Sequence, residues 1–445
     1  MCRKADNLSQ FQDAFNPEPL KSPEELNTFY LNTALARTGD EYSDFVNNLS
    51  LQLEDCTEVC LHKLFIGHPG CGKTTELFQL MNKTNELGFF TCIGRCDLEL
   101  DSADIEYTDV LFLILDLLLR KAEDEEMKIS QEVVEEIYDY WNNETEIVEA
   151  VLTQQELAGE TTIKAKLGLA NVISIMGRIK GVIKNSSDSR TEIRKHIEPK
   201  SSELVNKIKR VIEILSDECE KKGKKKNPVI ILDGLDKIPL EQARKIFREN
   251  GARFSLLNVH LIVTFPIALT YTPEYSDIQT WFPNPEKLPM IKLRKWDNDH
   301  YVEPYTAGIE TMRKIVLKRA NASLFEKGVL DNLIKSTGGY IRDLFRCIAR
   351  AAIRARSRQS GTISMEDAKN ALNNLESDIN GRYSDGLIST MRKIYEGEKF
   401  VSSSSEMTQL LQIGAVLEYN GQRWCDLHPL VEKWLLEHGK IESSN

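Results

Sequence analysis

The chain has 445 residues, more than one hydrophobic core usually serves, so we expect two or three domains. Its composition is that of a globular protein, with 41% hydrophobic and 28% charged residues, and its net charge of −11 argues against wholesale binding to nucleic acid or to a membrane surface. No apolar run approaches the roughly 20 residues that cross a bilayer, no signal peptide is recognisable, and nine scattered cysteines suit a reducing compartment, so we expect a cytoplasmic protein without stable membrane insertion.

The first 50 residues are expected to form a helical N-terminal arm. Prolines at 17 and 19 interrupt it, and Ser22-Pro23-Glu24-Glu25 then opens a helix with proline at its first position. Further on, the pairs Cys56/Cys60 and Cys92/Cys96 do not have the two-residue spacing of a zinc knuckle. They lie in or beside expected buried strands, so simple burial is favoured over a zinc site.

A phosphate-binding loop follows an apolar strand at 61–66 and precedes a helix at 74–87. The glycines allow successive backbone N–H groups to point at phosphate oxygens, and the helix start adds partial positive charge. The strand–loop–helix context argues against a chance glycine-rich turn. We therefore expect this loop to bind a nucleoside triphosphate, with Lys73 reaching the β- and γ-phosphates and the Thr74 hydroxyl holding Mg²⁺. The loop residues are Gly67, His68, Pro69, Gly70, Cys71, Gly72, Lys73, Thr74 and Thr75.

Strand and helix patterns alternate after the loop. A strand at 89–93, an acidic loop at 97–106 and an apolar helix at 110–119 predict an α/β core with a parallel sheet. Residues 121–200 break this alternation and are expected to be a helical insert. Its basic stretch, 164–184, has apolar residues at helical spacing, so this helix could lie on a membrane or a partner, or pack on its own domain, which we favour.

The second half of the nucleotide site is expected at a strand over 229–233. Its run of Val, Ile and Leu is typical of a strand buried on both faces, and Asp233 ends it, where a carboxylate can help hold Mg²⁺. Asp236 is the candidate for positioning the attacking water. The alternative is that both aspartates only cap a loop. A further strand at 259–264 should lie beside this one. The Thr264 hydroxyl could then sense the γ-phosphate or orient water, or Thr264 could simply end the strand. A strand at 287–293 would complete the sheet.

These motifs resemble the AAA+/STAND branch of P-loop ATPases, with a Cdc6/Orc-like arrangement behind the core, over roughly residues 25–440. The resemblance is specific at 67–75, at 230–237 and at 337–344. It implies that these segments are Walker A, Walker B and the start of a lid helix. It also implies that Thr264 is the sensor-1 residue, and that Arg342 is a sensor-2 arginine touching the γ-phosphate. ATP is preferred to GTP through this resemblance only.

Two departures from the AAA+ pattern bear on the mechanism. Gly234 stands where an ordinary AAA+ Walker B has glutamate, and the order Asp-Gly-Leu-Asp looks like the STAND pattern, which shifts the water-activating carboxylate to Asp236. No arginine occurs between Arg253 and Arg294, the region from which AAA+ rings supply an arginine finger to a neighbour. The resemblance therefore favours a nucleotide switch over a ring motor.

From about Asn298 the chain is expected to be helical and to form a lid. Its helix carries arginines at four-residue intervals along one face, which could hold an acidic surface such as 97–126, a nucleic-acid backbone, or surface salt bridges: Arg342, Arg346, Arg350 and Arg354.

Helices at 385–395 and 405–412, then a hairpin at 417–424 with an Asn-Gly turn, resemble a winged helix. The expected recognition helix, 406–412, contains no Lys or Arg, which argues against duplex binding. His428 is expected to be a cap or hinge contact rather than a catalyst.

The expected architecture is an N-terminal arm (1–50), a P-loop NTPase core (51–297) with an insert at about 121–200, a helical lid (298–376) and a winged-helix-like domain (377–445). The expected function is an ATP-binding, slowly hydrolysing switch that uses Mg²⁺, with a possible sensing role, for example in bacterial defence. Such a switch would act on a separate effector, a protein partner or further copies of itself. The rivals are a Cdc6/Orc-like ATP-gated DNA-binding initiator or loader, for which DNA binding is only weakly supported, and a scaffold that holds nucleotide permanently.

Overall fold

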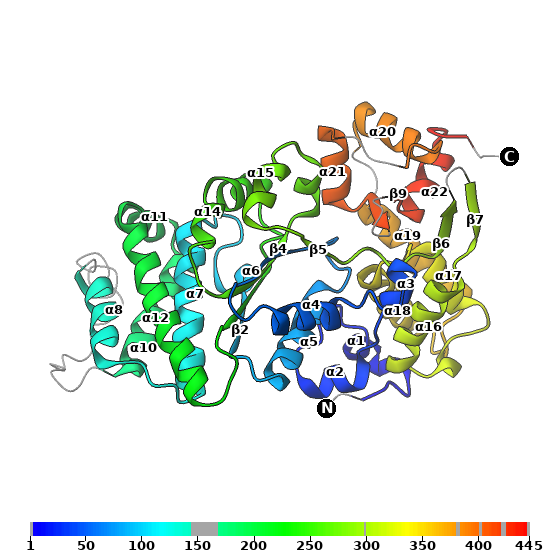
Figure 1. The fold of residues 1–445 in the computed structure, drawn as a ribbon. Coiled ribbons are helices and arrows are strands. Elements are labelled where there is room, and N and C mark those ends of the chain that lie inside the picture. The colour runs from blue at the N-terminus through cyan, green and yellow to red at the C-terminus, as the bar shows by residue number, and fades with distance from the viewer. Residues whose placement is uncertain are drawn as a thin grey trace.

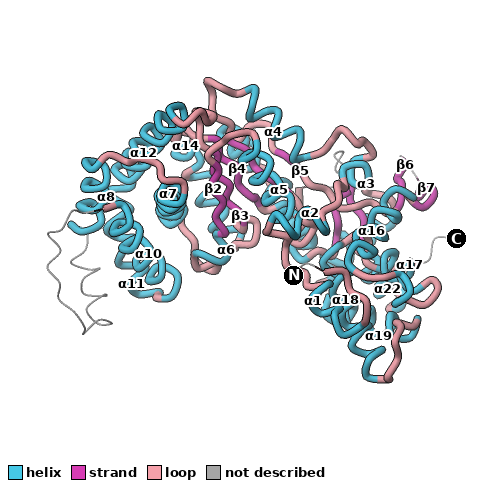
Figure 2. The backbone as a smooth tube through the Cα atoms, turned by 90° about the horizontal axis from the view of Figure 1, so that it is seen from below, coloured by secondary structure: helices cyan, strands magenta, loops and turns pink. Residues whose placement is uncertain are grey.

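The computed structural model describes residues 3–143, 168–297, 300–379, 383–399, 403–419 and 424–442. Helices of the insert lie at one end of the molecule, the sheet lies in the middle, and the lid and C-terminal helices lie at the other end (Figures 1 and 2). Within the described part of the chain, no helix combines the length and apolar character needed to span a membrane.

Five parallel strands form the central sheet, in the order β2-β3-β4-β1-β5. The fold is therefore α/β with a parallel sheet, as the alternating pattern predicts. In β3 and β4 every residue is buried, which explains their continuous apolar sequences. The strands are β1 (His62–Ile66), β2 (Thr91–Arg95), β3 (Val229–Asp233), β4 (His260–Phe265) and β5 (Glu286–Lys287).

Helix α7 (Tyr107–Asp124) separates the sheet from the insert. Its residues from Val110 to Leu119 are all buried, because the helix packs on β2 on one side and on the insert helices on the other. The other helices of the core are α4 (Phe45–Asp55), α5 (Lys73–Glu86), α6 (Cys96–Glu99), α13 (Leu240–Arg244), α14 (Gly251–Phe254) and α15 (Tyr275–Trp281).

The insert is a helical layer packed on α7. The apolar face of its basic helix α10 is buried in the core through Val172, Met176, Ile179 and Ile183, so this helix packs on its own chain, as we favoured. The remaining part of the basic stretch, 164–167, lies outside the described residues. The described insert helices are α8 (Gln131–Asn143), α10 (Leu169–Asn185) and α11 (Ser187–Ile197), followed by α12 (Ser201–Lys221).

The N-terminal arm lies against the lid in both views of the fold. Phe11 and Phe15 share a hydrophobic cluster with Phe345 of the lid, and Ala5 N donates a hydrogen bond to Arg319 O at 2.8 Å. Ser22 and Glu25 form a capping box with proline at the first helical position, as predicted for this start. The arm contains α1 (Phe11–Ala14), α2 (Pro23–Phe29) and α3 (Ala34–Thr38).

The described residues after 293 do not begin with a helix, so the expectation of helical structure from about 298 is wrong. Two antiparallel strands, β6 (Arg294–Asp297) and β7 (His300–Pro304), come first, and helices begin only at Thr306. Both strands are short and mix charged residues with aromatic and apolar ones, so their sequence carries no clear hydrophobic strand signal. The lid helices are α16 (Thr306–Arg319), α17 (Val329–Ser336), α18 (Ile341–Ser357) and α19 (Met365–Ile379).

The C-terminal unit has the predicted order of two helices and a hairpin, followed by a last helix. Strands β8 and β9 pair antiparallel, whereas the Asn420-Gly421 turn lies outside the described residues. The expected strand at 287–293 is only two residues long as β5, because Met290 instead pairs with Tyr419 of β8. The C-terminal unit thus joins the sheet edge. Its elements are α20 (Asp385–Tyr395), α21 (Ser405–Ile413), β8 (Val416–Tyr419), β9 (Trp424–Leu427) and α22 (Pro429–Glu437).

Candidate functional site

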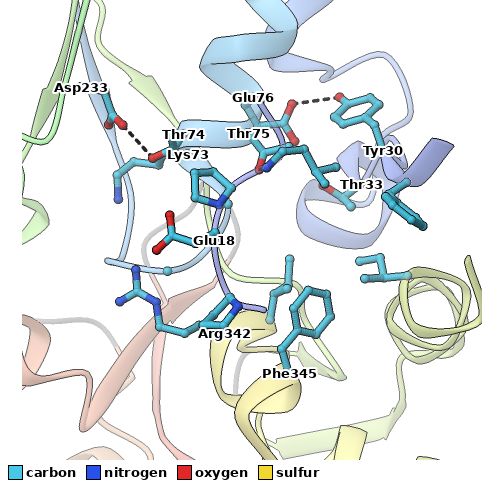
Figure 3. A pocket seen from close by; sticks show the side chains of 18 of the residues that line it. Glu18, Tyr30, Thr33, Lys73, Thr74, Thr75, Glu76, Asp233, Arg342 and Phe345 are labelled. Carbon is cyan, nitrogen blue, oxygen red and sulfur yellow. Dashed lines mark hydrogen bonds between the residues drawn. The ribbon is translucent and has the colours of Figure 1, made fainter. Parts of the chain in front are cut away.

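A cavity of about 280 Å³ lies at the carboxyl ends of the parallel strands, where ligands bind in open α/β sheets. Its walls come from the N-terminal arm, the loop before α5, the ends of β2 and β3, and the lid. Figure 3 shows Lys73 and Thr74 on one side of this cavity and the lid residues Arg342 and Phe345 on the other.

The loop before α5 has a backbone that only glycine adopts without strain. Gly70 and Gly72 have φ of +88° and +113°. Gly67 is needed for a different reason, since a Cβ there would lie 2.7 Å from the backbone oxygen of Leu288. The glycine spacing of the sequence therefore reflects backbone conformation at two positions and close packing at the third.

Lys73 is buried at the centre of the loop. Its Nζ donates hydrogen bonds to Gly67 O at 2.6 Å and His68 O at 2.8 Å, and it lies 2.9 Å from Asp236 Oδ2. Burial has the largest single effect and disfavours the charged amine, but the neighbouring negative groups, Asp236 first among them, together raise the pKa of Lys73. The cation expected to bind phosphate is thus present and paired within the site.

Thr74 and Asp233 meet as the sequence predicts for a Mg²⁺ site. The Thr74 hydroxyl donates to Asp233 Oδ2 at 2.7 Å, and the other oxygen, Oδ1, is buried without a hydrogen-bond partner among the described residues. Burial, together with the charge of Asp236, raises the pKa of Asp233. A hydroxyl beside a carboxylate with an unused oxygen is a donor set that fits Mg²⁺.

Arg342 reaches the loop from the lid helix α18. A Cβ on Gly70 would lie 2.7 Å from Arg342 Nε, so the guanidinium lies directly against the loop. Within the described chain, this side chain forms no hydrogen bond or ion pair, which leaves its charge available in the cavity. Its neighbour Tyr340 donates a hydrogen bond to Pro69 O.

Thr264 does not line the cavity. Its hydroxyl is fully buried and accepts a hydrogen bond from Leu235 N at 3.1 Å. In this structure the expected sensor-1 residue therefore supports the turn between Asp233 and Asp236, and it does not face the space where phosphate would lie.

Several residues of the arm contribute to the site, although no motif marks them in the sequence. Arg37 is buried and donates hydrogen bonds to Cys71 O at 2.7 Å and to Pro289 O. It therefore connects the phosphate loop to the segment that follows β5. Tyr30 donates to Glu76 at 2.9 Å, and burial raises the pKa of Glu76 to about 7. Leu20 N donates to Thr75 Oγ1 at 3.2 Å.

The cavity lining has an apolar part and a charged part. The apolar part, which we call the apolar end, comes from the arm and the lid: Pro17, Leu20, Phe29, Ile315 and Phe345. The guanidinium of Arg319 lies over the rings of Phe29 and Phe345. Apolar walls with a few convergent charged groups are typical of a small-molecule site. A planar base with a charged tail fits this division.

His68 links the loop to the C-terminal unit. It is buried, and its Nε2 accepts a hydrogen bond from Glu418 N of β8 at 2.8 Å. Burial and the nearby charge of Lys73 lower the pKa of His68 to about 3, so the ring is neutral at physiological pH. Glu418 itself accepts a hydrogen bond from Tyr271 and lies 3.5 Å from Lys287, so β8 is attached to the core at several points.

The three arginines that continue the four-residue series after Arg342 pair within the lid. Arg346 and Arg350 contact Asp378, and Arg354 contacts Glu366. They are therefore a surface salt-bridge face, and they do not contact the segment 97–126.

His428 caps α22, as expected for a structural role. Its Nδ1 accepts a hydrogen bond from Leu430 N at 3.2 Å.

Cys92 and Cys96 are buried in the main core, while Cys56 and Cys60 are partly exposed. In the described ranges, no three side chains of His, Cys, Asp or Glu are grouped so that they could hold a metal ion.

No family model and no curated protein matches this sequence. Solved structures do match over most of the chain. The Orc2 protein of Aeropyrum pernix, in ADPNP–ADP complexes, is 12% identical with a TM-score of 0.42, over 87% of this chain and 91% of that one. A Walker-type ATPase of Pyrococcus abyssi is 12% identical with a TM-score of 0.44, over 95% and 99%. Cdc6 of Pyrobaculum aerophilum is 10% identical with a TM-score of 0.38, over 96% and 98%.

The Cdc6 and Orc proteins among these structures belong to the group that the sequence motifs resemble. Likeness at this level of identity concerns the fold alone.

Proposed function

We propose that this protein is an ATP-binding, slowly hydrolysing molecular switch of the STAND/AAA+ type, in which the nucleotide state of the loop controls the position of the C-terminal unit. One observation carries the proposal. Two consecutive residues of the phosphate loop are held from outside the core, His68 by β8 and Pro69 by Tyr340 of the lid.

Binding of ATP follows from the residues of the cavity. The loop amides, Lys73 and Arg342 would take the phosphates, Thr74 and Asp233 would hold Mg²⁺, and the apolar end would take the base. Magnesium bound there would neutralise phosphate charge.

Hydrolysis is assigned to Asp236. In this structure its carboxylate pairs with Lys73 at 2.9 Å. When Lys73 turns to a phosphate, Asp236 loses that partner and can accept a proton from water. No glutamate stands at position 234, so we expect slow turnover.

Coupling follows from the hydrogen bonds of Lys73. Its Nζ binds the backbone oxygens of Gly67 and His68, and a phosphate would compete for the same ammonium group. Release of the His68 carbonyl allows the backbone of His68 to move, and its ring carries the contact to Glu418 of β8. We therefore expect ATP to loosen the C-terminal unit, because its γ-phosphate draws both Lys73 and Arg342 of the lid, and we expect ADP, which lacks that phosphate, to leave the unit docked.

The switch is preferred to a DNA-binding initiator on two observations. Arg346, Arg350 and Arg354 of α18 are paired with carboxylates of α19, and α21 contains no Lys or Arg. Phosphate contacts by basic side chains dominate affinity for DNA, and these surfaces offer few unpaired ones. The released unit would instead engage a protein effector or another copy of the chain.

The test is hydrogen–deuterium exchange of β8 and α22 in the intact protein, without nucleotide, with Mg·ADP and with Mg·ATP. We expect faster exchange of β8 amides with ATP only. Lys73→Ala should lose the response, and Lys369→Ala, an exposed lysine of α19, should keep it. Identical exchange in all three conditions, with ATP binding demonstrated by calorimetry, would refute the switch while leaving nucleotide binding intact.

A further inference from the structure

Arg95 lies in the nucleotide cavity, and no motif assigns it a role. It ends β2, and its backbone pairs in register with Asp233 at the end of β3. Its Nε lies 3.1 Å from Asp233 Oδ2, the same oxygen that accepts the hydrogen bond from Thr74. The guanidinium therefore lies beside the residues expected to hold Mg²⁺.

The guanidinium of Arg95 has unused hydrogen-bonding capacity. Its Nε and Nη2 donate to the two oxygens of Asp97, each at 3.0 Å. The third nitrogen, Nη1, is buried and has no hydrogen-bond partner among the described residues. A buried donor without a partner costs free energy, and a phosphate oxygen bound in the cavity would recover it.

Asp97 holds Arg95 in this position, and Gly234 makes room for Asp97. Gly234 has φ of +94°, and a Cβ at this position would lie 2.7 Å from Asp97 Cγ. Lys237 also contacts Asp97, so the carboxylate is held from two sides. The departure from the AAA+ pattern at 234 thus has a physical reason: the space that a glutamate side chain would need is filled by Asp97.

We propose that Arg95 is a further phosphate-binding residue, which supplies from this chain the cation for the terminal phosphate of ATP, and that Asp97 is its positioning residue. The inference rests on the proposed function, because it assumes that the cavity binds ATP. It also fits the absence of arginine between 253 and 294. Arginines supplied by the same chain neutralise the terminal phosphate in some other P-loop NTPases.

The charges of the site support this assignment. Lys73 has a partner in Asp236, whereas Arg95 shares Asp233 with the Thr74 hydroxyl. A cation bound by Asp233 would compete with Arg95 for this carboxylate. The Nε and Nη2 groups would stay with Asp97, and the two N–H groups of Nη1 would be left to the phosphate.

The test compares affinities for Mg·ATP and Mg·ADP, measured by calorimetry on the full chain with Arg95→Ala, Arg95→Lys and Asp97→Asn. Arg356→Ala, which removes an exposed arginine of α18, is the matched control. We expect Arg95→Ala to weaken ATP binding by about tenfold or more and ADP binding by less than about threefold. Arg95→Lys should bind ATP more tightly than Arg95→Ala but less tightly than the wild type. Asp97→Asn should also weaken ATP binding more than ADP binding, by a smaller factor than Arg95→Ala.

If Arg95 only supported the structure, its replacement would weaken ATP and ADP binding by the same factor. Equal losses for ATP and ADP would therefore overturn the inference. Unchanged affinities in Arg95→Ala would overturn it as well. Both results leave the proposed function standing, because wild-type binding is measured in the same series. If the wild-type protein bound neither nucleotide, the proposed function itself would fail.

Discussion

The ammonium group of Lys73 lies 2.9 Å from a carboxylate oxygen of Asp236, and both side chains are buried. The residue expected to bind phosphate is therefore neutralised by the residue expected to position water. A phosphate that recruits Lys73 also frees Asp236, so binding and activation of water are linked through one ion pair.

Replacing Lys73 by alanine should abolish ATP binding, because the central cation of the loop is lost. It should also lower the free energy of unfolding by about 3 to 5 kcal/mol, since Asp236 remains buried without its partner. Calorimetry and urea unfolding measure the two effects. The double variant with Asp236→Asn should regain much of the stability and none of the binding. A stable Lys73→Ala protein would show that the pair contributes little.

Asp236→Asn should keep ATP affinity within about threefold while lowering turnover by a factor of about 10² to 10⁴, the usual contribution of a general base. Steady-state phosphate release measures this effect. Asp277→Asn, on the exposed face of α15, is the control and should hydrolyse ATP at the wild-type rate. Undiminished hydrolysis by Asp236→Asn would remove its assigned role.

Gly234→Glu restores the acid of the ordinary AAA+ motif, yet it should not raise turnover. The new side chain would collide with Asp97, and φ of +94° is strained for any residue with a Cβ. We expect Gly234→Ala to cost roughly 2 to 4 kcal/mol of stability. The control is Gly361→Ala, where a Cβ meets nothing within 4 Å. Faster hydrolysis by Gly234→Glu would contradict our account of this position.

The free energy of unfolding should fall as the pH is lowered from 6.5 towards the folded-state pKa of His68, which is about 3. Its pKa is about 3 in the folded chain, against an ordinary value of 6.5, so the unfolded chain binds the proton more readily. The neutral His68 ring therefore stabilises the fold fully above pH 6.5. On acidification to pH 4, the free energy of unfolding should fall by on the order of 3 kcal/mol. Urea unfolding of the wild type and of His68→Gln at several pH values isolates this residue. Parallel pH profiles would show that His68 is not the cause.

The sequence predicts the elements that local patterns define. The glycine spacing of the loop and the apolar runs ending at Ile66 and Asp233 predict that Lys73, Thr74 and Asp233 lie at one edge of the sheet, and Thr74 and Asp233 do meet there, because strand and loop motifs are local. Their roles in binding stay predictions.

What the sequence does not predict depends on partners far along the chain. Arg37 contacts the loop from the arm, and Arg95 meets Asp233 only because β2 pairs with β3. Thr264 is identified as a strand end, but its hydrogen bond to Leu235 depends on the register of β3 and β4. Sequence patterns do not predict β6 and β7, because strands this short, with charged residues among the apolar ones, carry no periodic signal.

The pairing of Met290 with Tyr419 has a practical consequence. Leu417, Tyr419 and Trp424 pack in one apolar cluster with Phe65 and Met290 of the core. A protein shortened before residue 416 would uncover these side chains together with the border strand of the sheet. Exposed strand borders recruit other chains. Preparations of the shortened protein should therefore self-associate, and kinetic studies need the full-length molecule.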